Sequence, residues 1–307
     1  MNTPYVSIIM SAYKPLKHDI DTTIHSVLNQ TFHDFEFIIL KDDDLPDTLL
    51  LLREWADKDI RIKVIDNVKN IGLIASLNKG LDHAAGSLIS RIDVGDWWEF
   101  SKLEKQVNLF HSDPALHLCG TSLVLVDAEH HPIGYHNAQT TDTEITKQLM
   151  EGSNPFAHSS VMFRKTPFRY NSKALYCEDF ELWCRYSQIG SMANIGEPLT
   201  HYLIDTSGIT GQKRSLMIEN TTRIYCFFLN ALTNNNFSFL EKGIPITPKE
   251  TISYLQKISN QWYSKAIAAS LNHQYLQKNG YLVLAVLSNP ALIWNKMKRL
   301  YCKRRYL

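Results

Sequence analysis

The sequence predicts an α/β protein in which a mostly parallel, Rossmann-like central sheet is flanked by helices and followed by a helical C-terminal subdomain. Short apolar runs of strand type alternate with amphipathic stretches through the first third of the chain. Acidic residues directly follow several of the apolar runs. Strand-like patterns disappear after about residue 214. Together these three observations indicate one α/β domain with a helical extension.

The first half alternates between the periodicities that distinguish strands from helices. Apolar runs of buried-strand type predict strands at 6–10, 35–40, 62–65 and 88–92. Apolar residues spaced three to four positions apart predict helices at 19–29, 49–56, 73–85 and 102–110. Asn70 is expected to cap the third of these helices and Gly86 to end it. Such a β-α-β series predicts parallel strands joined by right-handed crossovers.

The second half is mixed and then helical. We expect strands at 123–126 and 160–163, a turn at 130–134 and a helix at 180–189. Farther along, helical patterns occupy 216–232, 249–258, 261–277 and 281–287. The glycines at 208 and 211 mark the change of pattern. The predicted domains are therefore 1–212 and 213–307.

Composition and charge exclude several classes of protein. The 307 residues are 44% hydrophobic and 21% charged, as in ordinary globular proteins. The net charge of +1 gives no reason to expect a nucleic-acid partner. The five cysteines show no CxxC spacing, so neither a disulfide framework nor a zinc site is expected, and a cytoplasmic setting fits best. We recognise no signal peptide and no stretch of about 20 apolar residues.

Acidic residues gather where expected strands end. They are Asp42, Asp43, Asp44, Asp93, Asp96, Glu178 and Asp179, with Asp47 as a weaker member. In an open α/β sheet, ligands bind at the carboxyl ends of the strands. Carboxylates there can bind a divalent cation, a ribose or the proton of a hydroxyl, which suggests chemistry on a phosphorylated sugar. The first strand is followed by neither GxGxxG nor a P-loop, so a dehydrogenase or a P-loop nucleotide-binding protein is not expected.

Short motifs recur in a fixed order over about residues 4–200. They are VSIIMSAY at 6–13, SVLNQTF at 26–32, FEFII at 35–39, NIGL at 70–73, SLNKGL at 76–81, RID at 91–93, EKQ at 104–106, NPF with a histidine at 154–158, and EDFELW at 178–183. In this order they resemble the bacterial family 2 glycosyltransferases of the GT-A fold. The resemblance implies an inverting transferase that builds cell-surface polysaccharide or lipooligosaccharide. It further implies a donor half at about 1–100 and an acceptor half at about 101–212.

The resemblance implies a nucleotide-sugar donor, with UDP as the nucleotide, at the carboxyl edge of the sheet. The residues at the corresponding positions are Ala12, Tyr13, Asp42, Asp43, Asn70, Arg91 and Asp93. A carboxylate such as that of Asp43 can accept a hydrogen bond from uracil or ribose, and Tyr13 can stack on the base. The alternative is that residues 42–47 form only a solvated turn and a helix cap. That alternative suits Asp47, which precedes a helical pattern.

Asp93-Val94-Gly95-Asp96 occupies the metal-binding segment of the family. By resemblance, Asp93 and Asp96 hold Mn²⁺ or Mg²⁺, which neutralises the leaving diphosphate. Gly95 stands where the family carries a further carboxylate. An acidic turn without a metal is the alternative interpretation.

A second departure from the family pattern follows near residue 200. Leu203 and Asp205 stand where the family often carries basic side chains, and Lys213 or Arg214 could replace the lost charges. With Gly95, these departures motivate an alternative function, that of a non-catalytic glycosyltransferase-like partner or sugar-binding subunit. The retained acidic residues favour the enzyme.

The acceptor side is expected around the second acidic pair. By resemblance, Asp179 serves as the general base for the acceptor hydroxyl, with Glu178 as the second candidate. Negative charge at a helix N-terminus is a structural reason for the same two residues. His158 is a candidate for the acceptor pocket. One of Trp97 and Trp98 is expected to form a sugar-binding platform and the other to be buried.

The C-terminal segment 294–306 mixes basic and aromatic residues. Such a segment can bind an anionic membrane surface, which would suit a glycan or lipid-linked glycan acceptor. The alternative is a solvated helix end. We therefore expect a cytoplasmic protein, peripheral on the inner face of the cell membrane.

Overall fold

The computed structural model describes residues 3–204 and 213–245. The chain divides into two units after Arg214, and the first unit contains the whole sheet. The described part of the second unit consists of α8 (Arg214–Thr233) and α9 (Phe239–Lys242). The helices expected at 249–258, 261–277 and 281–287 lie outside the described residues. A separate helical subdomain at 213–307 stays a prediction.

The first half of the chain forms the expected alternation of strands and helices. The elements are β1 (Val6–Ala12), α1 (Lys17–Leu28), β2 (Phe35–Lys41), α2 (Pro46–Lys58), β3 (Ile62–Asp66), α3 (Leu73–His83), β4 (Leu88–Arg91), β5 (Trp97–Trp98) and α4 (Lys102–Ser112). The second half adds β6 (Leu116–Val126), β7 (Pro132–His136), α5 (Asp142–Met150), a 3₁₀ turn (His158–Ser160), β8 (Met162–Arg164), α6 (Glu178–Tyr186) and β9 (Ser191–Leu203).

One sheet runs through the described part of the first unit, in the order β3-β2-β1-β4-β8-β6-β9-β5, with β7 paired to β6. The strands β1 to β4 pair in parallel, as the β-α-β series predicts. The later strands add antiparallel pairs through β8, β7 and β5 and one parallel pair between β6 and β9. The predicted α/β class with a largely parallel first half is thereby confirmed.

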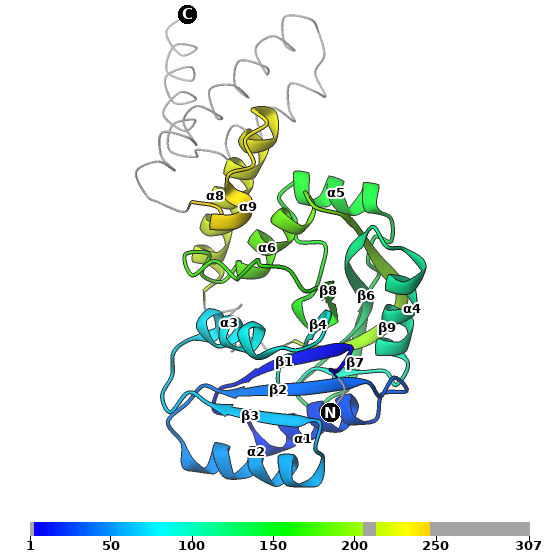
Figure 1. Cartoon of the computed structure of the whole chain (residues 1–307), viewed down its shortest axis with the longest axis vertical. Helices are drawn as coiled ribbons and strands as arrows, with labels where there is room; N and C mark the ends of the chain where they lie inside the picture. The colour runs from blue at the N-terminus through cyan, green and yellow to red at the C-terminus, as the bar shows by residue number, and fades with distance from the viewer. Residues whose placement is uncertain (1–2, 205–212, 246–307) are drawn as a thin grey trace, which may run out of the picture. The chain divides into compact units, whose positions relative to one another are not determined.

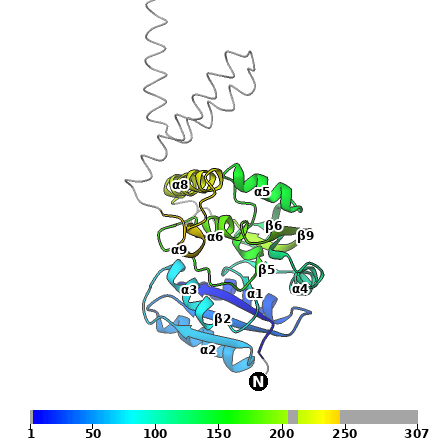
Figure 2. The ribbon, with the colours of Figure 1, turned by 45° about the horizontal axis from the view of Figure 1, so that its top comes forward.

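Helices cover both faces of the first four strands. Figure 1 and Figure 2 show α2 and α3 on opposite sides of β1 to β3. Alternate residues of β1, such as Ile8 and Met10, pack in one core cluster with apolar residues of α1, α2 and α4. Ile9 points to the other face, where its side chain meets α3 at Gly80. Because successive strand residues face opposite sides, strands buried on both faces read as continuous apolar runs.

Several elements, most of them in the second half, were not predicted from the sequence. The strand β9 contains Gly196 and Pro198 and shifts its register against β6 twice in this region, so its apolar pattern is interrupted. The strand β5 is only two residues long. The helix α5 begins with a capping box, in which Thr141 accepts from the Glu144 N–H and the Glu144 carboxylate accepts from Thr141. The Thr-x-x-Glu pattern is a known sequence signal for the start of a helix, but it was not used to predict α5.

Leu73 begins α3 as predicted, but the residues expected to cap and to end this helix were wrong. Gly72, at φ +88°, is the residue that precedes the helix, and Asn70 instead accepts the Gly72 N–H in the preceding loop. The helix ends at His83 rather than at Gly86. A Cβ on Gly86 would lie 2.6 Å from the backbone nitrogen of Ser7. Gly86 therefore permits close approach to β1 and does not terminate the helix.

Candidate functional site

The carboxyl ends of three parallel strands bring the predicted donor residues to one edge of the sheet. Ala12 pairs with Lys41 at the ends of β1 and β2, and Arg91 lies beside Ile9 at the end of β4. The residues that follow these ends therefore share this edge. This is the place where an open α/β sheet offers a ligand crevice.

Asp43 holds the ends of β1 and β2 together. Its carboxylate accepts hydrogen bonds from the backbone N–H groups of Lys14 (2.8 Å) and Leu45 (3.0 Å) and from the Thr48 hydroxyl (2.9 Å). Burial acts to raise the pKa of Asp43, but these bonds and the Lys41 ammonium together lower it. The carboxylate is fully buried, so Asp43 organises the two loops around the crevice. Its predicted contact with base or ribose stays a prediction.

Asp42 performs the same task for the loop after β3. It accepts hydrogen bonds from the backbone N–H groups of Ile71 (2.8 Å) and Gly72 (3.0 Å) and from the Asn67 amide (3.1 Å). Asn70 lies exposed in this loop. The pair Asp42 and Asp43 therefore fixes the loops that follow β1, β2 and β3 through backbone contacts.

Tyr13 is a predicted donor residue with an exposed side chain. Its ring is 52% exposed, whereas Ala12 is fully buried at the end of β1. The Lys14 ammonium lies 5.3 Å from the centre of the Tyr13 ring. An exposed aromatic ring at the carboxyl edge has the geometry to stack on a base, with a cation beside it for phosphate.

Arg91 and Asp93 form a buried ion pair next to the crevice. Both Arg91 terminal nitrogens donate to the two Asp93 carboxylate oxygens, in the bidentate geometry favoured by guanidinium groups. Arg91 is 2% exposed, while the Asp93 side chain remains 41% exposed. The Ser159 hydroxyl accepts the Asp93 N–H at 2.9 Å. Arg91 thus holds Asp93 with one side of its carboxylate still open to a ligand.

Asp96 lies inside the same segment. Its Oδ1 accepts the Leu203 N–H at 2.7 Å, and its Oδ2 is buried with no hydrogen-bond partner among residues 3–204 and 213–245. Burial, and then repulsion from Asp93, raises the pKa of Asp96 to about 7. A buried carboxylate oxygen without a partner, close to a second carboxylate, is a place where a cation would remove repulsion.

The loop conformation at Gly95 suits a glycine and leaves little room for a carboxylate side chain. Its φ is +94°, a conformation that favours glycine. A Cβ at this position would lie 2.8 Å from Cδ2 of Leu203. The two departures from the family pattern, Gly95 and Leu203, are therefore neighbours in space.

Glu178 and Asp179 begin helix α6, as negative charge at a helix N-terminus favours. Asp179 accepts hydrogen bonds from the Asn154 amide and from the Phe180 N–H, both at 2.7 Å. Burial raises the pKa of Asp179. Burial, and then the charge of Asp179, raises the pKa of Glu178 to about 7. A carboxylate that is buried in part and fixed by two donors is suited to accept a proton.

Electrostatic interactions link the donor-side acids, Asp93 and Asp96, with the acceptor-side acids, Glu178 and Asp179. The charge of Arg91 lowers the pKa of Asp96, Glu178 and Asp179, although burial outweighs it in each case. The hydroxyl of Tyr202 is influenced by Asp96, Asp93 and Asp179, and burial together with these charges raises its pKa. The charge of Arg91 therefore acts on acids of both the donor side and the acceptor side, and acids of both sides act on Tyr202.

Two supporting residues were missed as site members in the sequence. Asn154 orients Asp179, and its place in the Asn-Pro-Phe motif was the available signal. Tyr202 had no signal of its own, because only the fold brings β9 next to the segment after β4. Of the other predicted residues here, Asp205 lies outside the described part of the chain.

The acceptor-site candidates His158, Trp97 and Trp98 lie in different surroundings. His158 hydrogen-bonds the Tyr170 hydroxyl through Nε2 at 2.8 Å, and burial lowers the pKa of His158. Trp98 is 2% exposed and donates its indole N–H to the Ser159 carbonyl at 2.8 Å. Trp97 is only partly buried and stacks on His201 with ring centres 4.6 Å apart. Trp97 is thus the accessible ring of the pair.

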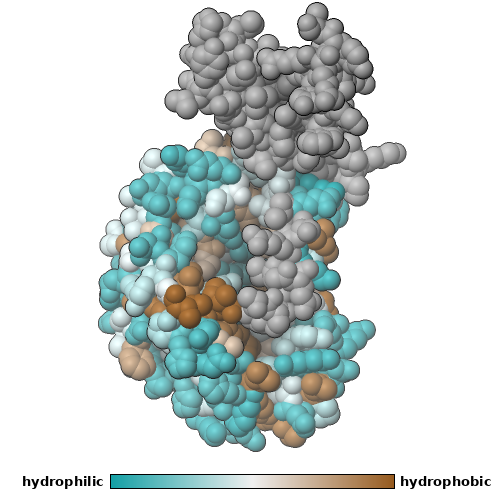
Figure 3. Space-filling model, turned by 180° about the vertical axis from the view of Figure 1, so that it is seen from behind, coloured by the Kyte–Doolittle hydropathy of each residue, from teal (hydrophilic) through white to brown (hydrophobic). Residues whose placement is uncertain are grey.

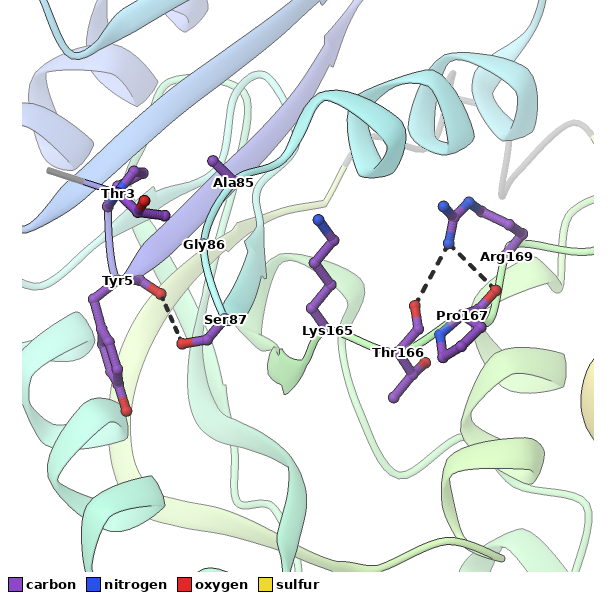
Figure 4. A pocket seen from close by; sticks show the side chains of 10 residues that line it. Thr3, Tyr5, Ala85, Gly86, Ser87, Lys165, Thr166, Pro167 and Arg169 are labelled. Carbon is purple, nitrogen blue, oxygen red and sulfur yellow. Dashed lines mark hydrogen bonds between the residues drawn. The ribbon is translucent and has the colours of Figure 1, made fainter. Parts of the chain in front are cut away.

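A cavity in the described part of the chain lies away from these acids. It measures about 740 Å³ and is lined by residues 3–5, 85–87, 165–167 and 169, which lie beside the starts of β1 and β4 (Figure 4). These starts form the opposite edge of the parallel strands. Its two basic side chains are already paired, Lys165 with the Ala84 carbonyl and Arg169 with Asp82. The cavity is therefore not the candidate active site.

The described surface gives no sign of a membrane-crossing element. In the part of the chain that the structure describes, none of the helices combines the length and apolar character needed to cross a bilayer. The face seen in Figure 3 is mainly hydrophilic, with a compact apolar patch among smaller ones. The predicted membrane-binding segment, 294–306, lies outside the described residues.

The chain is similar to known proteins over much of its length. Residues 7–176, more than half of the chain, match the family model described as Glycosyl transferase family 2. An uncharacterised glycosyltransferase of Haemophilus influenzae is 28% identical over 93% of this chain and 90% of its own length. The amylovoran biosynthesis glycosyltransferase AmsE of Erwinia amylovora is 25% identical over 71% of this chain and 84% of its own length.

Solved structures share the fold. S. aureus TarS 1-349 in complex with UDP has a TM-score of 0.56 at 13% identity, covering 92% of this chain and 90% of TarS 1-349. The mannosyltransferase PcManGT of Pyrobaculum calidifontis, in complex with GDP-Man and Mn²⁺, has a TM-score of 0.54 at 13% identity, covering 94% and 88%. At this identity the likeness establishes the GT-A fold expected from the sequence and nothing finer.

Proposed function

We propose that this chain, which belongs to glycosyltransferase family 2, is an inverting transferase that moves a sugar from a UDP-sugar to a hydroxyl of a glycan or lipid-linked glycan. One observation carries the proposal. The half-exposed carboxylate of Asp93 pairs with the buried guanidinium of Arg91, and the charge of the same guanidinium acts on the fixed carboxylate of Asp179. A transferase needs such a pairing, because donor and acceptor must meet between a leaving-group site and a base.

The donor is proposed to bind at the carboxyl edge of β1, β2 and β4. Tyr13 offers an exposed ring for the base, and Asp42 and Asp43 hold the loops that frame it. UDP is the proposed nucleotide because TarS, which shares the fold, binds UDP. PcManGT binds GDP-Man, so GDP is the competing nucleotide that an experiment must include.

The acidic residues fit a divalent cation as a site of two carboxylates. Mg²⁺ in particular is commonly held by one or two carboxylates, with substrate phosphates and waters completing its shell. Asp93 offers an exposed carboxylate and Asp96 a buried oxygen without a partner in the described chain. Bound there, Mn²⁺ or Mg²⁺ would neutralise negative charge on the leaving diphosphate. Arg91 supplies a fixed positive charge at the same place.

The chemical step is proposed as a single displacement. Asp179 accepts the proton of the acceptor hydroxyl, whose oxygen attacks the anomeric carbon opposite the nucleotide. The new glycosidic bond forms as the bond to the diphosphate breaks, so the configuration inverts. Among the described residues, each Asp179 oxygen accepts one hydrogen bond, from Asn154 or from Phe180, which leaves lone pairs for the acceptor.

The acceptor is proposed to lie against Trp97, with His158 close to the Asp179 side of the site. The name of AmsE, an amylovoran biosynthesis glycosyltransferase, supports a role in bacterial polysaccharide biosynthesis. A cytoplasmic location at the inner face of the membrane, through residues 294–306, belongs to the same proposal.

The proposal is tested by calorimetric titration of UDP and of GDP into the full chain, with and without Mn²⁺. Micromolar UDP binding that strengthens with Mn²⁺ would support both donor and cation. Transfer from a panel of UDP-sugars, with the product anomer read by NMR, would then identify the sugar. Binding of GDP alone would overturn the UDP assignment. If neither nucleotide binds, the non-catalytic alternative replaces the enzyme.

A further inference from the structure

Two histidines and an aspartate from distant parts of the chain converge outside the proposed active site. His18 and Asp19 lie in the first turn of α1, and His130 lies in the turn between β6 and β7. One possible ligand atom of each residue lies within 4.8 Å of the others. In the described part of the chain this is the one such grouping of His, Cys, Asp and Glu.

The separations suit a small metal ion. The Asp19 Oδ1 lies 3.5 Å from Nε2 of His130 and 3.7 Å from Nδ1 of His18. Two ligands about 2.1 Å from a tetrahedral zinc ion lie roughly 3.4 Å apart. The Asp19 and His130 atoms are already close to that separation. His18, with 72% of its side chain exposed, is free to complete it.

His130 is held toward the group without a conventional partner. Its side chain is 15% exposed, and its Nε2 is buried without a hydrogen bond to any described residue. The ring packs between His18, at 4.5 Å, and Trp97, at 4.7 Å between ring centres. Trp97 is in turn stacked on His201. Buried polar nitrogens normally have a partner, so the orphaned Nε2 needs an explanation.

From these contacts we propose that His18, Asp19 and His130 form a transition-metal site, with Zn²⁺ as the ion best suited to it. Two neutral imidazoles and a carboxylate match the ligand preference of Zn²⁺, whereas Mg²⁺ prefers oxygen ligands alone. The ion would give the orphaned Nε2 its partner, and water would complete the shell. The expectation that no zinc site exists rested on cysteine spacing. Histidines more than a hundred residues apart carry no comparable signal in the sequence.

The site would tie α1 to the hairpin of β6 and β7 beside the segment after β4. Asp19 lies 3.9 Å from the position of a Cβ on Gly95. Thr23, one turn after Asp19 in α1, donates its hydroxyl to the Asp96 carbonyl at 2.8 Å. An ion at this place therefore stabilises the scaffold behind Asp93 and Asp96 and takes no part in the chemical step.

The competing interpretation is an ion pair between a protonated His130 and Asp19, without metal. An ion pair needs no third residue, so it leaves the exposed His18 unused. A metal site needs His18, because two protein ligands alone bind Zn²⁺ weakly. The dependence of Zn²⁺ binding on His18 therefore separates the two interpretations.

The test uses the full chain, purified without a histidine tag and stripped with EDTA. Titration calorimetry with Zn²⁺ should give saturable binding of about one ion per chain, with an increase in Tm. Visible absorption of the Co²⁺ form should report imidazole ligands in a tetrahedral field. Loss of a partner of a metal ligand already weakens binding about 10–100-fold, so His130→Gln and His18→Gln should each weaken it at least that much.

The matched control is His131→Gln, which changes the next residue of the same turn. His131 is 76% exposed and lies outside the group, so this variant should bind Zn²⁺ as the wild type does. Because His18 is exposed, His18→Gln should fold normally, and it remains informative if His130→Gln does not. Failure to bind Zn²⁺, or binding unaffected by His18→Gln, would overturn the proposal. UDP binding is measured separately, so the outcome does not depend on the proposed transferase activity.

Discussion

Gly95 and Leu203 lie against each other, so that a Cβ on Gly95 would come within 2.8 Å of the Leu203 side chain. The same two segments are joined by the hydrogen bond from the Leu203 N–H to Asp96. Both residues depart from the family pattern at places where charged groups are expected. Their contact means that the two departures form one local arrangement, in which an apolar side chain fills the space beside a glycine.

Gly95→Ala should destabilise the protein by roughly 1–3 kcal/mol, because the new Cβ meets both a positive φ and Leu203. Thermal or urea unfolding measures the loss. Combining it with Leu203→Ala should cost less than the sum of the two single changes, by about 0.5–3 kcal/mol. Gly134→Ala is the control, since its Cβ would meet only Leu125, at 3.8 Å. Strict additivity of the two changes would show that the contact is not responsible.

Asp179→Asn should reduce sugar transfer by about 10²–10⁴-fold, because the amide cannot accept the acceptor proton. UDP binding should stay within a factor of about two, since Asp179 lies on the acceptor side. Steady-state kinetics and calorimetry measure the two effects. Asp82→Asn, at an exposed ion pair with Arg169, is the control and should leave both unchanged. An active Asp179→Asn enzyme would remove Asp179 from the role of base.

Glu178→Gln should stabilise the protein at alkaline pH and much less near pH 5. Burial and Asp179 raise the folded-state pKa of Glu178 from 4.5 to about 7, so the folded state binds the proton more tightly than the unfolded state. Its favourable contribution is complete below the unfolded pKa and is lost as pH rises through about 7. Replacing it with a neutral amide removes that loss.

We expect the unfolding free energies of Glu178→Gln and wild type to diverge between about pH 4.5 and 7, reaching roughly 1–3 kcal/mol above it. Urea unfolding at several pH values measures this. Glu197→Gln, on an exposed carboxylate, is the control. A difference that did not change with pH would contradict the raised pKa.

Trp98→Ala should mainly reduce stability, whereas Trp97→Ala should mainly weaken acceptor binding. Trp98 is buried, bonds the Ser159 carbonyl and has the Lys102 ammonium 3.8 Å from its ring centre, so its loss should cost about 3–5 kcal/mol of stability. Trp97 stacks on His201 and packs at a tilt against His130, so its loss should cost on the order of 0.5–1.5 kcal/mol per ring contact. Trp97→Ala should instead raise KM for the acceptor with UDP binding unchanged. An unchanged acceptor KM would remove Trp97 from the acceptor site.

The sequence by itself determined the α/β class, the strands β1 to β4 and the position of the acidic residues at their ends. Those features depend on local periodicity and on the rule that parallel strands end at a common edge, which are both readable without a structure. The order of motifs also identified the family. Each of these signals depends on residues close together in the chain.

Only the tertiary structure decided how the acids are used. Leu203 meets Asp96 and Gly95 because β9 returns beside the segment after β4. Likewise His130 reaches Asp19 only through the packing of the β6–β7 hairpin on α1. Such contacts join residues far apart in sequence, where pairing follows from packing and from the satisfaction of buried polar groups rather than from spacing.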